Sequence, residues 1–282
     1  MDKTLPALFV SHGSPMIALE PGAAGAFMRE LGQAVDATFG RPKAIVAISA
    51  HTAARVPVLL AAPRHEAVYD FGNFDPRLFT LRYDAVGAPA LADRVAGLVR
   101  EAGLRIESVP EGGLDHGIWT ALRYVYPDAD IPVLPLAFVP SASPADQFAL
   151  GAALAPLAAE GVLVLGSGSI THNLRRAFAG GLRGPRDAPE IPESTAFRTW
   201  FAERSAARDW DALFDYRSRA PHAVDMHPTD EHLLPWYVAA GAGGRGQAPL
   251  RLHESVELGC IGMDAYAFGA GAEALGAALR RP

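Results

Sequence analysis

Three histidines of this chain come shortly after apolar runs that have the composition of buried strands. They are His12 in LFVSHGSP, His51 in AIVAISAHT and His172 in GSGSITHN. In open α/β sheets, ligands bind outside the carboxyl ends of the strands. Neutral imidazole is also the commonest metal-ligating side chain. If the strands are parallel, the three histidines meet at one edge of the sheet, and we expect a metal site there.

Two further histidines lie at predicted helix starts. His116 precedes the apolar run of GLDHGIWTALRYV, and His227 opens HPTDEHLLPWYVAAGA. Pro228 suits the first helical position, so we expect His227 near the N-cap, with Glu231 in the first turn. The remaining histidines fall into two groups: His222 and His232, which flank His227 and are candidates for an outer shell, and His65 and His253, which we expect at the surface.

A metal is the interpretation that best explains the set. Any one of these histidines is more often a surface or structural residue, but several at strand ends and helix starts are hard to place by chance. Zn(II) and Fe(II) both accept three or four nitrogen or oxygen ligands of this type. Other motifs are weak, because GSGSITHN matches neither a P-loop, nor GxGxxG, nor a GxSxG nucleophile elbow.

The elements that position these residues read as alternating strands and helices. Apolar runs at 7–10, 44–48, 58–61, 131–138 and 162–165 are mostly continuous, as in strands that are covered on both faces. Helical spacing appears at 25–35, 89–101, 118–126, 144–159 and 194–207. We therefore predict a single α/β domain over 1–282, with a mostly parallel central sheet, helices on both faces and the metal site at the carboxyl ends of the strands.

Composition excludes several classes of protein. The 282 residues carry a formal net charge of -6 and only short basic groups, which argues against a nucleic-acid surface. No uncharged membrane-spanning run or signal peptide is visible, and the lone Cys260 suits a reducing compartment, so we expect a cytoplasmic protein. Two long irregular stretches, 64–88 and 178–192, remain. The first contains YDFGNF and either covers a site or forms an edge of the fold.

The motifs together resemble those of a known family. SHGSP, SAHT, YDFGNF, GLDHGIW, GSGSITHNL, HPTDEHLLP and GMDAYAFG occur in this order over nearly the whole chain. With them the sequence resembles the LigB-like class III extradiol ring-cleavage dioxygenases, and within these the DOPA 4,5-dioxygenase branch. Residues 72–75 (GNFD) depart from the pattern of that branch, in a loop that the resemblance places near the substrate.

The resemblance implies a set of metal ligands and a metal. His12 and His51 match metal ligands of the family, and His227 matches the histidine of the HPT motif, with Glu231 as the alternative third ligand. His172 matches a residue that is either a further ligand or an acid/base group. His116 matches a histidine that contacts the oxygens of the substrate. Fe(II) is then expected for turnover, and Zn(II) is also accommodated in the isolated protein.

The resemblance also implies the reaction. A catechol similar to L-DOPA is opened by O2 to a semialdehyde, with His172 and His116 as the catalytic pair. We expect Tyr69, Phe71 and Phe74 to cover the ring, and Asp115 to lie in the substrate site and orient His116. Arg77 or Arg82 would pair with a carboxylate of the substrate.

Two other functions stay open, namely a zinc hydrolase with Glu231 as general base and a metal-storage protein. The expected partners are the catechol and O2, without nucleic acid or membrane. We expect a monomer or a small homo-oligomer.

Overall fold

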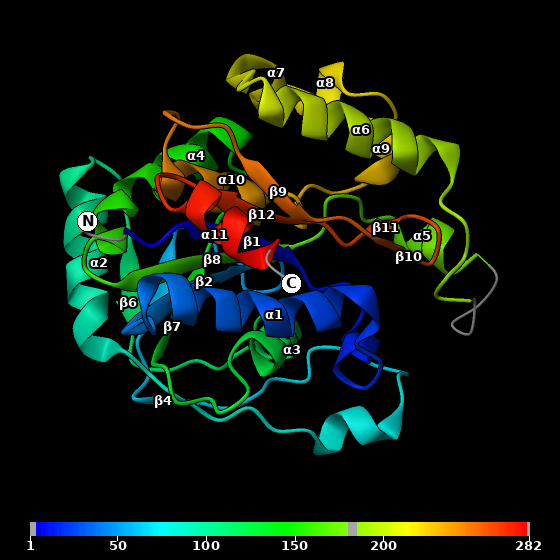
Figure 1. Ribbon diagram of the computed structural model, residues 1–282. Helices are drawn as coiled ribbons and strands as arrows, with labels where there is room; N and C mark the ends of the chain where they lie inside the picture. Colours follow the sequence, from blue (N-terminus) through cyan, green and yellow to red (C-terminus); the bar gives the residue numbers. More distant parts are fainter. Residues whose placement is uncertain (1–3, 180–184, 281–282) are drawn as a thin grey trace.

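An eight-stranded sheet crosses the centre of the protein, and its four middle strands run parallel (Figure 1). The computed structural model describes residues 4–179 and 185–280. The strand order is β6-β3-β7-β2-β8-β1-β12-β9. The parallel strands are β7 (Val133–Ala137), β2 (Ala44–Ser49), β8 (Val162–Gly168) and β1 (Ala7–Ser11). Around them lie β6 (Glu107–Val109), β3 (Val58–Leu60), β12 (Ala265–Phe268) and β9 (Leu250–His253).

The five predicted strands are all present, and the α/β fold class is confirmed. The sequence did not reveal the antiparallel edge, where β12 pairs with β1 and β9 pairs with β12. β9 reads LRLH and is only half-buried, so it lacks a continuous apolar run. β12 reads AYAF and is a buried apolar run as short as 7–10, but it was not among the predicted strands. At the opposite edge of the sheet, β3 pairs antiparallel with β7, and β6 pairs parallel with β3.

Helices cover both faces of the sheet, because alternate side chains of each strand enter two separate cores. In β1, Phe9 belongs to one core, while Leu8 and Val10 belong to the other. The core of Phe9 contains residues of α2 (Pro89–Glu101), α4 (Pro144–Ala153) and α10 (Leu234–Gly243). The second core contains residues of α1 (Gly22–Phe39), α3 (His116–Val125) and α11 (Ala272–Leu279). Four of these helices match predicted segments, α10 begins later than the helix start expected near His227, and α11 was not predicted.

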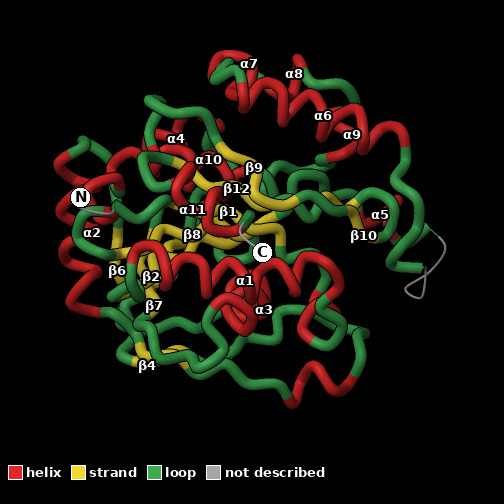
Figure 2. Tube along the Cα trace, in the orientation of Figure 1, coloured by secondary structure: helices red, strands yellow, loops and turns green. Residues whose placement is uncertain are grey.

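Shorter elements complete the fold. An outer group of helices, α6 (Pro192–Ala206), α7 (Trp210–Phe214), α8 (Tyr216–Arg219) and α9 (Ala223–Met226), lies together at the top of Figure 1. The long stretch 64–88 is mostly loop, interrupted by β4 (Arg64–His65), η2 (Pro76–Thr80) and β5 (Ala85–Val86) (Figure 2). The others are η1 (Pro15–Ala18), η3 (Ala155–Ala158), α5 (Leu174–Ala177), β10 (Val256–Glu257) and β11 (Ile261–Gly262).

A buried guanidinium ties the outer helices to the sheet edge. Arg198 of α6 donates two hydrogen bonds to the carboxylate of Asp264, which comes just before β12. The same guanidinium bonds Glu190, at 2.9 and 3.0 Å. Both Arg198 and Asp264 are almost fully buried and have lost their hydration. The ion pair compensates each charge for that loss.

The structure places two histidines differently from the sequence expectation, and it describes only part of one predicted irregular stretch. His65 is fully buried rather than at the surface, and His253 is half-buried, with its ring stacked on Phe27 at 4.7 Å. Of the predicted irregular stretch 178–192, residues 180–184 lie outside the described part of the chain. Within the described ranges, every helix is too short or too polar to cross a membrane.

We expect Gly151→Ala to destabilise the protein, because α4 packs on α10 with backbones in close approach. A Cβ at Gly151 would lie 1.9 Å from the carbonyl oxygen of Val238, which forces the helices apart. Overpacking of this kind typically costs about 1–3 kcal/mol. Gly97→Ala in α2 is the matched control, because its Cβ would meet nothing within 4 Å and should stabilise the helix by about 0.5–1 kcal/mol. Urea unfolding of both variants measures the difference, and equal midpoints would contradict the prediction.

Candidate functional site

Two of the predicted metal histidines meet at the carboxyl ends of the parallel strands. His12 follows the last residue of β1, and His51 lies two residues beyond the end of β2. Both strands flank β8, and their ends are level, because Ser11 is paired with Gly168 and Ser49 with Ser167. The two Nε2 atoms are 3.1 Å apart. The geometry expected of parallel strands is therefore present.

Two more imidazoles join them, and we call His12, His51, His116 and His232 the histidine cluster. The ring centroid of His116, the first residue of α3, lies 3.9 Å from that of His51. The ring of His232 lies 4.9 Å from that of His51 and 5.5 Å from that of His12. Ligand atoms of His12, His51 and His116 all lie within 4.8 Å of one another. The cluster is thus dense enough to hold a metal ion.

Each ring of the cluster has its Nδ1 turned toward an oxygen outside the cluster. The hydroxyl of Ser167 donates to Gly117 O, so it accepts from Nδ1–H of His12, at 2.9 Å. Nδ1 of His232 lies 3.1 Å from a carboxylate oxygen of Glu231. A carboxylate oxygen of Asp70 is 3.0 Å from Nδ1 of His116 and 3.6 Å from Nδ1 of His51. Metal-binding histidines have such partners because a fixed Nδ1–H leaves the Nε2 lone pair for the ion.

Two observations show that the cluster fits a metal ion. Nε2 of His232 is buried and has no hydrogen-bond partner among the described residues, which is costly for a polar atom. Nε2 of His12, left as an acceptor by Ser167, faces Nε2 of His51 at 3.1 Å. Two nitrogens that bind one tetrahedral ion at zinc–nitrogen distances are separated by about 3.3 Å. The spacing of the two nitrogens is therefore close to that of a shared ion.

Burial keeps the rings of His12, His51, His172 and His232 neutral at physiological pH. Desolvation, reinforced by neighbouring histidines, lowers the pKa of His12 and of His232 well below the ordinary value. Desolvation also lowers the pKa of His51 to about 4, and that of His172 to about 3. A neutral imidazole retains the lone pair that a metal or a proton needs, so the rings are ready to act as ligands or bases.

His172 lies beside the cluster, and it offers a ligand atom within 4.8 Å of those of Glu231 and His232. The orientation of its ring, however, is poorly suited to sharing an ion with His232. Its ring is stacked on that of His232, with centroids 3.4 Å apart and planes within 9°. The lone pairs of two parallel rings run in parallel planes and do not converge on one point. His172 also lines the cavity in front of the cluster. Its placement favours the acid/base role over the ligand role.

His227 lies outside the cluster, contrary to expectation. Its Nε2 is 2.7 Å from the carbonyl oxygen of Ile170, and its ring packs on Phe197. The expectation was wrong because the helix that we predicted to begin near His227 begins later in the chain. Residues 228–233 form turns, and α10 begins only at Leu234, with Pro235 in its first turn. His232, five residues further along the chain, takes the place that the sequence assigned to His227. His222 is exposed at the start of α9.

The close approach of His232 to the sheet depends on glycine at the end of β8. A Cβ at Gly168 would lie 2.0 Å from the carbonyl oxygen of His232, and one at Gly166 would lie 2.4 Å from that of Pro235. The same carbonyl of His232 accepts a hydrogen bond from Ser169 N, at 2.8 Å. The two glycines of GSGSITHN are therefore needed for close packing of β8 against the backbone at His232 and Pro235. Comparison with phosphate-binding motifs does not indicate this role.

A cavity of about 360 Å³ opens in front of the histidines. Its lining includes His51, His116, His172, Glu231 and His232. Phe71 and Phe74 also line it, and they belong to residues 69–74 (YDFGNF), which we call the aromatic loop. Phe71 and Phe74 therefore lie where they could cover a ring bound in this cavity, and their contact with a substrate stays a prediction. Tyr69 does not line this cavity; its hydroxyl donates to Leu81 O, and its ring meets Trp119.

Asp115, expected to face the substrate, instead supports the start of α3. Its carboxylate accepts hydrogen bonds from the hydroxyls of Ser49 and Thr52 and from Ile118 N. The side chain is an N-cap, and it neither lines the cavity nor bonds the ring of His116. Burial raises the pKa of Asp115, against the effect of these hydrogen bonds. Asp70, which the sequence did not single out, provides the carboxylate at His116.

The two arginines proposed for a substrate carboxylate lie away from the cavity. Arg77 forms two hydrogen bonds with Asp75, and Arg82 does the same with Asp84. Their side chains are 69% and 62% exposed. Both are paired surface groups.

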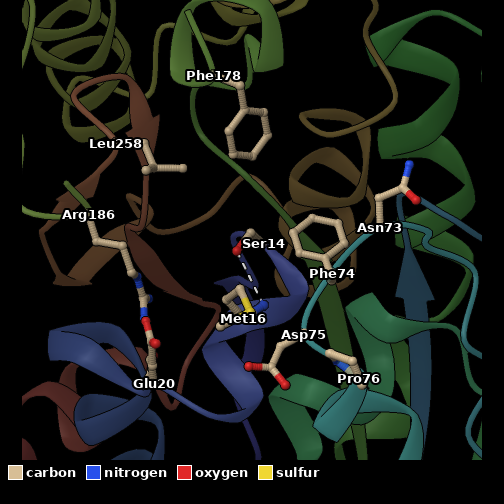
Figure 3. Close-up of a pocket in the computed structure, with 10 residues that line it drawn as sticks. All are labelled: Ser14, Met16, Glu20, Asn73, Phe74, Asp75, Pro76, Phe178, Arg186 and Leu258. Carbon is tan, nitrogen blue, oxygen red and sulfur yellow. Dashed lines mark hydrogen bonds and ion pairs between the residues drawn. The ribbon is translucent and has the colours of Figure 1, made fainter. Parts of the chain in front are cut away.

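A second cavity, of about 540 Å³, adjoins the first (Figure 3). The two share Ser14, Phe74 and Phe178 in their linings. Leu258 and Phe178 form an apolar side of this outer cavity, and Asp75 lies across from them. Arg186 closes another side, where it is paired with Glu20 and with Glu257. The arrangement suits a ligand that extends beyond the histidines.

Comparison with known proteins gives the family. The model for the catalytic LigB subunit of aromatic ring-opening dioxygenase matches residues 6–269. A Beta vulgaris protein named 4,5-DOPA dioxygenase extradiol is 33% identical over 269 residues, which are 95% of this chain and 97% of the relative. An Escherichia coli K12 protein of the same name is 34% identical over 266 residues, which are 92% and 93% of the two chains.

A solved structure agrees with these matches. An uncharacterized protein from Escherichia coli K12 superposes with a TM-score of 0.76 at 31% identity, over 94% of this chain and 100% of its own. The order of the motifs, the histidine cluster at the sheet edge and these matches lead to one conclusion. The chain belongs to the LigB family of aromatic ring-opening dioxygenases, and it is an extradiol ring-cleavage enzyme.

Proposed function

We propose that the protein opens the ring of a catechol with O2, at an Fe(II) ion held by His12, His51 and His232. The observation that carries this proposal is the facing pair of Nε2 atoms in His12 and His51, at 3.1 Å. The ring of His232 lies 4.9 Å from that of His51, and its Nε2 has no hydrogen-bond partner among the described residues. When bound, Fe(II) supplies open coordination positions and the redox activity that O2 chemistry needs, whereas Zn(II) supplies Lewis acidity alone.

In this proposal His172 moves the proton of the substrate. Its imidazole is neutral at physiological pH, because burial lowers its pKa, so a ring nitrogen offers a lone pair to a catechol hydroxyl. The pKa of that hydroxyl would be lowered by a bound metal ion, which would let its proton pass to the ring. The protonated ring then returns that proton during ring opening. His116 also lines the cavity, and its Nε2 accepts a hydrogen bond from the second hydroxyl. Both rings act from fixed positions, which reduces the entropic part of the barrier.

Apolar side chains hold the aromatic ring and exclude water. Phe71 meets the ring of His116 edge-on, at 5.5 Å, and Phe74 meets Phe71 edge-on, at 5.8 Å. A catechol between these rings and the histidines loses contact with bulk water, which strengthens hydrogen bonds to its hydroxyls. A substituent on the catechol, as in L-DOPA, then extends past Phe74 and Phe178 into the outer cavity.

Oxygen uptake tests the reaction itself. Metal-stripped protein is loaded anaerobically with Fe(II), mixed with a catechol and exposed to air. We expect stoichiometric O2 consumption and a coloured ring-opened product, both lost in His172→Ala. Protein that binds Fe(II) but consumes no O2 across a panel of catechols would contradict the proposal. Ester or amide hydrolysis by the Zn(II) form would then favour a hydrolase that uses Glu231 as general base.

The ligand set is tested by metal affinity rather than by activity. We expect His232→Ala to lose at least ten-fold in affinity for Zn(II) or Co(II), because one of three ligands is removed. His227→Gln is the matched control in the same segment, and it should retain the affinity, since Nε2 of His227 faces the Ile170 carbonyl. Competition with a chromogenic chelator measures both. Loss of affinity in the His227 variant alone would restore the assignment made from sequence.

Filling the outer cavity tests the location of the substituent. Leu258→Trp places a larger side chain in a cavity that Leu258 lines. We expect KM to rise at least several-fold for L-DOPA and to stay unchanged for unsubstituted catechol, which fits in front of the histidines. Steady-state kinetics with the two substrates make the comparison. A parallel change for both would show that the substituent lies elsewhere.

A further inference from the structure

The geometry points to Asp70 as the positioning residue that fixes the imidazole of His116 for catalysis, a role that rests on the proposed function. Asp70 belongs to the same loop as Phe71 and Phe74, which cover the cavity. One loop thus both encloses the substrate and sets the hydrogen-bonding state of a ring that meets it.

The backbone around Asp70 is held against the segment that leads into α3. Val68 N donates to Leu114 O at 2.7 Å, and Leu114 N donates to Glu66 O at 2.9 Å. The indole Nε1 of Trp119 donates to Val68 O at 3.1 Å. This ladder runs alongside Leu114 and stops just before His116. These hydrogen bonds fix the backbone before Asp70 relative to the segment before His116. The carboxylate of Asp70 is therefore held next to His116.

Both oxygens of Asp70 are used by His116. Oδ1 accepts from the backbone N–H of His116 at 2.9 Å, and Oδ2 is 3.0 Å from its Nδ1. An ionised carboxylate only accepts hydrogen bonds, so Nδ1 carries the hydrogen and Nε2 keeps the lone pair. The side chain of His116 is 7% exposed and has little freedom to turn over. Asp70 therefore selects the tautomer that accepts a hydrogen bond from the substrate at Nε2.

Two nearby contacts define the limits of this role. Asp115, the neighbour of His116 in sequence, is occupied with Ser49, Thr52 and Ile118 N, so it cannot replace Asp70 at the ring. Asp70 also lies 3.6 Å from Nδ1 of His51, beyond hydrogen-bond distance. We therefore infer that the principal effect of Asp70 passes through His116 and that metal binding depends on it only weakly.

Asp70→Asn is the informative variant. The asparagine has one carbonyl oxygen, which the backbone N–H of His116 occupies. Its NH2 group then faces Nδ1, which must become the acceptor, and the ring hydrogen moves to Nε2. The shape of the side chain is retained, so the loop stays docked, while the tautomer is reversed. Asp84→Asn is the control, because Asp84 pairs with Arg82 in the same irregular stretch and away from the cavity.

The experiment is a double-mutant cycle on the Fe(II)-loaded enzyme with catechol. We expect Asp70→Asn to lower kcat about 10- to 100-fold, as for other residues that orient an imidazole. KM and metal content should stay within about two-fold. In a His116→Ala background, Asp70→Asn should produce no further loss, since residues that act as one unit are not additive. Additive losses, or a loss of Fe(II) in Asp70→Asn, would overturn the inference.

A second measurement does not depend on turnover. Nitrogen-15 NMR of the histidine side chains in the Zn(II)-loaded protein reports which nitrogen of His116 carries the hydrogen. We expect Nδ1–H in the wild type and Nε2–H in Asp70→Asn, with no change in Asp84→Asn. An Nε2–H tautomer in the wild type would overturn the role of Asp70, even if ring cleavage is observed. An inactive wild type with Nδ1–H would contradict the proposed function and leave the orienting contact standing.

Discussion

Burial of neutral imidazoles at one edge of a parallel sheet is the constraint on which the site depends. Desolvation lowers the pKa of His12, His51 and His232, so their lone pairs are available at physiological pH. A buried lone pair without a partner is costly, and several that face each other are more so. The inward-facing nitrogens of the cluster therefore carry a free-energy penalty, which a bound cation would remove. The oxygens around the cluster, on Ser167, Glu231 and Asp70, fix which nitrogen of His12, His232 and His116 faces inward.

The sheet and α10 meet closely enough to bring His232 to that edge. Gly166 and Gly168 of β8 leave room for the backbone at Pro235 and His232. The middle of the cluster is thus built from strand ends on one side and from the turn before α10 on the other. His227 serves the same region differently, because its bond to Ile170 O fixes the loop that leads to His172. One short motif therefore supplies both a member of the histidine cluster and a structural histidine.

The aromatic loop is part of the site because its backbone is anchored. Hydrogen bonds from Val68 and Trp119 hold it along the segment before α3. Phe71 and Phe74 then lie over the cavity with little freedom to be lost on binding. The outer helices are anchored in a comparable way, by the buried Arg198–Asp264 pair beside β12. Hydrogen bonds to the backbone of the chain thus support the loop that covers the cavity.

Periodicity and motif order were enough to predict the α/β class, the parallel strands and the positions of His12 and His51. These features are local, because a continuous apolar run specifies a buried strand and the residue after it lies at the sheet edge. The sequence did not indicate that His232 rather than His227 joins the cluster, or that Asp70 rather than Asp115 meets the ring of His116. Both outcomes depend on where α10 begins after its turns and on which segment packs beside His116. Those are contacts between residues far apart in sequence, and the packing of the folded chain alone brings them within hydrogen-bond distance.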